Sequence, residues 1–148
     1  MSLEDHDTLM DPRVLDAALP RPDFDHASMQ LSYTLVDDAT GEEHAFTLPA
    51  RFEVCPLCRG HGTHVAPGVD ACGLTDSQMH DDPDFAQAYR RGRFDVTCVR
   101  CEGKRVVGAP DEAVLSEHER GLLARWNAEL DARRAYARQC ALERAMGC

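Results

Sequence analysis

Two short cysteine motifs constrain this chain more than any other part of its sequence. Residues 55–62 read C-P-L-C-R-G-H-G, and residues 98–104 read C-V-R-C-E-G-K. We call each motif a knuckle, because a C-x-x-C pair places two thiols on one tight turn. Two knuckles that meet in the fold supply four thiolates, the ligand set of a closed tetrahedral zinc site. The spacing therefore predicts one structural Zn²⁺ ion bound by Cys55, Cys58, Cys98 and Cys101.

The sequence around the knuckles is repeated. Residues 51–54 lead into the first knuckle and residues 93–97 into the second, while residues 63–65 and 105–107 lead out of them. This is an internal repeat of strand, knuckle and strand, with one extra residue in the second copy. The repeat predicts that the ion lies between the two copies.

Glycines and cations near the cysteines support a metal site. Gly60 and Gly103 each follow the second cysteine of a knuckle by two residues, where a positive φ would let the chain reverse. Four thiolates around a divalent ion carry a net charge near −2, which nearby cations can offset: Arg59, Arg100, Lys104 and Arg105. The alternative is a pair of disulfides or unrelated thiols. The spacing, the glycines and the flanking repeat all favour the metal.

The first knuckle spells C-x-x-C-x-G-x-G in full, and so resembles the half-site of the cysteine-rich domain of DnaJ-type co-chaperones. The second knuckle matches this spelling with Lys104 in place of the last glycine. In that family two half-sites bind one zinc ion, so the resemblance implies the same four cysteine ligands and a domain that helps to hold unfolded polypeptide. The chain has two half-sites where the family has four. It also lacks the His-Pro-Asp signature of a J-domain, so co-chaperone activity does not carry over.

Residues 55–107 also resemble small bacteriophage and host proteins that pair two such knuckles across a similar insert. That resemblance names no activity. An accessory role in a phage or mobile element, such as inhibition of a host or rival protein, fits the resemblance.

Composition favours one globular domain in a reducing cytoplasm. The chain has no run of 18 apolar residues that could span a membrane, and its acidic N-terminus is unlike a secretory signal. Seven cysteines is an odd number. Four of them have metal spacing, and no role is predicted for Cys72, Cys140 and Cys148 or for the remaining histidines.

The negative charge lies mainly in the first third of the chain. The net charge is −10, and residues 1–50 hold 11 acidic residues against two arginines. An acidic surface repels nucleic acid and attracts basic proteins. The same residues could equally form a solvated arm that only aids solubility.

The fold predicted from these patterns is α+β and has three parts. Residues 1–28 form an acidic, mostly irregular arm with one short helix starting at Pro12. Residues 29–110 contain a β-hairpin (29–36 and 43–48) that ends at Pro49, followed by a zinc-ribbon-like pair of knuckle units. Their insert holds a helix over residues 83–91 capped by Asp82. Residues 111–148 form a long helix over 117–145, opened by a Ser116–Glu119 capping box.

The leading functional hypothesis is a non-enzymatic, zinc-stabilised protein-interaction module. No phosphate loop, G-x-S-x-G or H-E-x-x-H motif occurs, and four cysteine ligands leave no position for a catalytic water. The alternative is nucleic-acid binding through a basic cluster near the second knuckle: Arg90, Arg91, Arg93, Arg100, Lys104 and Arg105, with Tyr89 and Phe94 among them. A third hypothesis is thiol–disulfide or chaperone-like activity. The sparsely apolar second half of the last helix could also form a homodimer or bind a partner.

Overall fold

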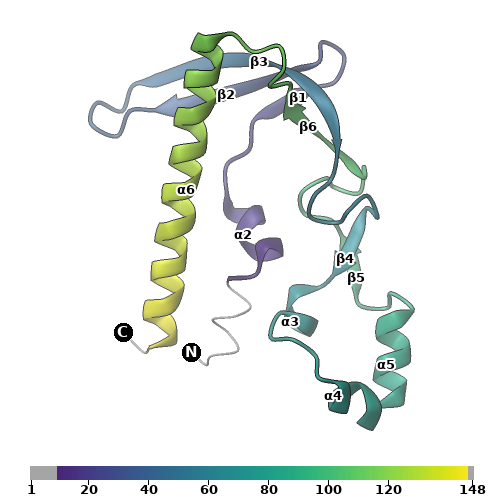
Figure 1. The fold of residues 1–148 in the computed structure, drawn as a ribbon. Coiled ribbons are helices and arrows are strands. Elements are labelled where there is room, and N and C mark those ends of the chain that lie inside the picture. The colour runs from purple at the N-terminus through teal and green to yellow at the C-terminus, as the bar shows by residue number, and fades with distance from the viewer. Residues whose placement is uncertain (1–9, 147–148) are drawn as a thin grey trace.

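The computed structural model describes residues 10–146, which form an α+β fold with the predicted layout (Figure 1). An antiparallel four-stranded sheet has the order β1-β2-β3-β6, and β4 and β5 form a separate two-stranded sheet. The strands are β1 (Asp23–Asp25), β2 (Gln30–Val36), β3 (Glu43–Val54), β4 (Thr63–Val65), β5 (Asp95–Thr97) and β6 (Val106–Pro110). The helices are α2 (Pro12–Ala18), α3 (Pro67–Asp70), α4 (Asp76–Asp81), α5 (Pro83–Arg90) and α6 (Glu117–Ala145).

The predicted hairpin is the β2–β3 pair. Leu31, Tyr33 and Leu35 alternate with exposed residues along β2 and are all buried, as the period-two pattern indicates. The turn closes where the Gly41 N–H donates to the Asp37 carbonyl, and Gly41 has a φ of 71°. That left-handed conformation favours glycine at this position.

The prediction that Pro49 ends the second strand is wrong, because β3 continues through it to Val54. The Ala50 N–H donates to the Met29 carbonyl on the β2 side, so Pro49 directs its main-chain groups to the other side. There its carbonyl accepts from the Asp111 N–H, just beyond the end of β6. Proline has no N–H to donate. At residue 49 this removes no hydrogen bond between strands, because β3 changes its partner from β2 to β6 there.

The expectation that the arm is irregular outside its short helix is also incomplete. α2 forms as predicted, with Pro12 in its first turn and Asp11 accepting from the Arg13 N–H. Residues 23–25, however, add the edge strand β1, in which Phe24 pairs with Leu31. The three-residue pattern of one aromatic between two aspartates carries too little periodicity to predict a strand.

Phe24 lies directly over Gly108 of β6, so a side chain at position 108 has no space. A Cβ atom there would lie 2.5 Å from the Phe24 ring. We expect Gly108→Ala to lower the free energy of unfolding by about 1–3 kcal/mol, the usual cost of overpacking. Denaturant unfolding would measure this change. The matched control is Gly121→Ala, which adds the same methyl group where nothing lies within 4 Å.

A double variant tests the cause of that loss. Because the clash is with the ring, Phe24→Ala should remove most of the additional penalty of Gly108→Ala. Additive losses in the two single variants would show that the ring is not responsible.

The main core lies between the β2–β3 hairpin and the first half of α6. Trp126 is 8% exposed and packs edge-on against Tyr33, with ring centroids 5.1 Å apart. Tyr33 stacks in turn on Phe46 at 4.9 Å, and burial raises the pKa of Tyr33 to about 12. Leu115 and Leu123 complete this cluster with Leu31, Leu35, Leu48 and Ala50.

α6 begins and ends within the range predicted from the sequence. Its N-terminus has the expected capping box, in which Ser116 accepts from the Glu119 N–H and Glu119 accepts from the Ser116 N–H. The C-terminal part of the helix extends away from the sheet (Figure 1), and Tyr136 and Leu142 are exposed. The apolar stripe therefore thins where the sequence indicates. No helix within residues 10–146 is long and apolar enough to cross a bilayer.

The insert between the knuckles contains three short helices. α5 has the predicted Asp82 cap, which accepts from the Phe85 N–H. α4 has the capping box spelled by Thr75 and Gln78. A single helical turn, α3, forms at Pro67. In Figure 1 these helices lie below the β4–β5 pair, away from the four-stranded sheet.

The arm is bound to the second knuckle and to the insert. Arg21 donates to the carbonyls of Val99 and Arg100, at 2.9 and 2.8 Å. Asp16 of α2 forms an ion pair with Arg100 at 3.2 Å. Arg13 donates to the Val65 carbonyl and forms ion pairs with Asp11 and Asp70, both at 2.7 Å. Residues 11–25 therefore pack on the middle of the protein despite their acidic sequence.

Candidate metal centre

The two knuckles are held together by reciprocal strand pairing. The incoming strand β3 of the first copy pairs with the outgoing strand β6 of the second, and β5 pairs with β4 in the same way. The Cys55 N–H donates to the Arg105 carbonyl and the Cys98 N–H to the Gly62 carbonyl, each at 3.0 Å. Equivalent residues thus make equivalent bonds across a local two-fold axis between the copies.

This symmetry corrects two details of the predicted repeat. Val54 pairs with Val106 and Thr97 pairs with Thr63, so each ladder starts one residue before a first cysteine. Counted from the cysteines, the second copy has no extra residue. The likeness of Arg51-Phe52 to Arg93-Phe94 therefore does not mark structurally equivalent positions.

The residue that replaces the last glycine of the motif is Arg105 rather than Lys104. Gly62 and Arg105 make the equivalent bonds described above and have similar φ angles, 79° and 71°. Gly60 and Gly103 also match, with φ angles of 86° and 83°, as the turn predicted. Left-handed conformations at non-glycine residues carry a strain cost. Arg105 bears that cost directly after the second knuckle, and Glu102 bears it within the knuckle at a φ of 54°.

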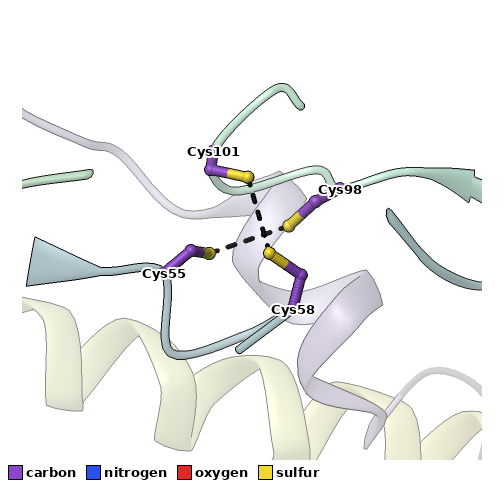
Figure 2. Close-up of side chains that lie close together, drawn as sticks. All are labelled: Cys55, Cys58, Cys98 and Cys101. Atoms are coloured by element: carbon purple, nitrogen blue, oxygen red, sulfur yellow. Dashed lines mark hydrogen bonds between the residues drawn. The ribbon is translucent and has the colours of Figure 1, made fainter. Parts of the chain in front are cut away.

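The four cysteine side chains point toward one centre (Figure 2). The Cys55 and Cys98 sulfurs lie 3.8 Å apart, the Cys58 and Cys101 sulfurs lie 3.6 Å apart, and all four lie within 4.8 Å of one another. A tetrahedron with Zn–S bonds of about 2.3 Å has sulfur–sulfur edges of about 3.8 Å. The donor set and its dimensions therefore fit a tetrahedral metal ion. This confirms that the four cysteines lie where a metal site needs them.

Burial and sulfur spacing set this cluster apart from disulfides. All four cysteines are at most 4% exposed, and a disulfide needs sulfurs only about 2.05 Å apart. Leu57 and Val107 pack against the cluster.

The protein main chain stabilises one thiolate in particular. Burial raises the pKa of Cys58, but hydrogen bonds outweigh this effect and lower it to about 6. Foremost among them is the bond from the Gly62 N–H to the Cys58 Sγ, at 3.3 Å. Burial raises the pKa of Cys55 to about 12 and also raises that of Cys98. The cluster therefore already favours a negative charge at Cys58.

The remaining histidines and cysteines do not make a second cluster among the residues the structure describes. His64 is held between the Val65 carbonyl, 2.9 Å from its Nδ1, and the Val99 N–H, which donates to its Nε2. His61, Cys72 and His80 are exposed, and Cys140 lies on α6. Cys148 lies outside the described residues.

The predicted basic cluster is divided between the end of α5 and the second knuckle. Arg90 ends α5 and Arg91 follows it, both exposed, whereas Arg100 is occupied by Asp16 of the arm. The two aromatic residues make contacts within the insert. The Tyr89 hydroxyl donates to Asp70, and the Phe94 ring lies 5.4 Å from the Phe85 ring. Arg93, Lys104 and Arg105 are exposed.

The fold and site define an α+β protein built around a two-fold-symmetric cluster of four cysteines. No protein family, curated protein or solved structure matches the chain. The likenesses to DnaJ-type half-sites and to phage proteins therefore rest on the motif alone.

Proposed function

We propose that this protein is a non-catalytic interaction module whose centre is held together by one structural zinc ion. The observation that carries the proposal is the closed cluster of four buried sulfurs at tetrahedral spacing. Zinc takes four thiolates in such sites and needs no further ligand. With the coordination sphere filled, a water nucleophile has no place on the ion, which supports a structural role.

The reciprocal strand pairing supports the same conclusion. Each strand joined to a knuckle pairs with the other copy, so the ion and the two ladders stabilise one unit. A reactive dithiol would instead need exposure to a partner thiol, and these sulfurs are buried. A reducing cytoplasm suits four unoxidised thiolates.

Metal analysis of the purified protein tests this proposal. We expect one zinc ion per chain, measured by native mass spectrometry together with elemental analysis. Blocking all thiols with a mercurial should release that ion in a one-to-one ratio. Protein without metal, or with an iron–sulfur cluster in its place, would contradict the proposal.

A further inference from the structure

A groove of about 730 Å³ runs between α6, the chain joining α2 to β1, and the edge strand β6. All five residues of β6 line this groove. Side chains alternate between the two faces of a strand, so a cavity over one face would meet mainly every second residue. Contact with five consecutive residues therefore places the groove along the free edge of β6.

The main chain along this edge has hydrogen-bonding groups that β3 does not use. β6 is the last strand of its sheet. Arg105 and Asp111 bond to β3 or to its adjoining residues, so the odd-numbered residues between them also face β3. Val106 and Gly108 consequently point their N–H and C=O groups away from β3. No hydrogen bond within the part of the chain that the structure describes uses these groups.

The groove has an apolar wall, and charged residues of both signs line the rest of it. Apolar side chains come from α6, β1 and β2: Leu123, Trp126, Leu130, Phe24, Leu31 and Tyr33. The charged residues at the groove are nearly balanced in sign: Asp16, Asp23, Glu53, Glu102 and Glu112 against Arg21, Arg100, Lys104 and Arg134. Such a balance does not select a polyanion such as nucleic acid.

We propose that this groove binds an extended segment of a partner protein, which joins the sheet as a further strand along β6. An extended polypeptide supplies alternating donors and acceptors at the spacing of Val106 and Gly108, and its apolar side chains would lie against α6. The β6 edge of a second copy is enclosed by its own groove, which favours a separate extended segment over a second copy as the occupant. The inference rests on the interaction function proposed above and identifies its surface.

Amide hydrogen exchange on the zinc-loaded full chain tests the proposal. The probe is a peptide selected from a random display library on that protein. Binding should slow exchange at the amides of Val106 and Gly108 by at least about tenfold. The amides of Val107 and Ala109 should change little, because they already bond to β3. N-methylation of alternate peptide residues should weaken binding by at least about tenfold, since it removes the donors that β6 requires.

A pair of variants tests the groove wall. Leu130→Glu places a charge in the groove and should weaken peptide binding by at least about tenfold. Leu142→Glu, at an exposed position on the same helix, should have no effect. Each variant is compared at equal zinc content and equal circular dichroism. If Leu130→Glu does not fold, the N-methylated peptide makes the comparison on the unaltered protein.

Several results would overturn the inference. They are a library that yields no peptide, a bound peptide that leaves Val106 and Gly108 unprotected, and binding that Leu130→Glu does not weaken. Protection of the Val106 and Gly108 amides that rises with protein concentration, without peptide, would show that a second copy binds along β6. If the protein also holds one zinc ion per chain, any of these results would reject peptide binding at the groove without contradicting the proposed metal centre.

Discussion

Replacing Cys58 with serine is expected to remove the proposed zinc ion and unfold the middle of the protein. Structural zinc sites supply about 10–16 kcal/mol of apparent binding free energy, whereas whole domains are stable by only about 5–15 kcal/mol. Loss of one of four ligands therefore removes an amount comparable to the total stability. Chelation of the metal from the unaltered protein should give the same unfolded middle, because the ladders β3–β6 and β4–β5 depend on the centre.

Metal content and circular dichroism would measure this loss. The control is Cys140→Ser, which removes a thiol from α6, away from the four-cysteine cluster. It should retain one zinc ion and change stability by no more than about 0.5 kcal/mol. A Cys58→Ser protein that keeps both its metal and its spectrum would show that the cysteines do not hold the fold together.

Trp126→Ala is expected to lower the free energy of unfolding by about 3–5 kcal/mol, the usual cost of removing a large aromatic side chain from a core. Trp126 is 8% exposed and packs against Tyr33. It is the largest side chain that joins α6 to the sheet. Its removal should therefore loosen the helix as well as leave a cavity.

Denaturant unfolding at fixed zinc concentration would measure this effect. Tyr136→Ala removes an aromatic side chain from the same helix where it is 71% exposed, so it should change stability by no more than about 0.5 kcal/mol. Equal losses in the two variants would indicate that α6 does not pack on the sheet through Trp126.

The elements with local signals could be predicted from the sequence. α6 was predictable because its capping box and apolar spacing agree, and its bounds, Glu117–Ala145, match the expectation. The hairpin followed from the alternation in β2. The four cysteines that the structure brings together are those that the spacing paired, because a C-x-x-C motif is itself a local signal.

Features that depend on distant contacts could not be predicted in this way. β1 pairs with β2 and places Phe24 over Gly108, and no local pattern links these residues along the chain. Pro49 fits inside a strand only because β3 changes partner there. The docking of the arm depends on Arg21 reaching the carbonyls of the second knuckle, which no local pattern encodes.

The reciprocal pairing of the knuckles has a consequence for synthesis of the chain on the ribosome. Equivalent cysteines are 43 residues apart, and every strand joined to one knuckle needs its partner from the other copy. At about 5–20 residues per second, roughly 2–9 s separate the emergence of the two knuckles. During that interval the first knuckle is an unprotected dithiol with only half of the proposed ligand set. Oxidation or capture by a competing metal would therefore act chiefly on the nascent chain.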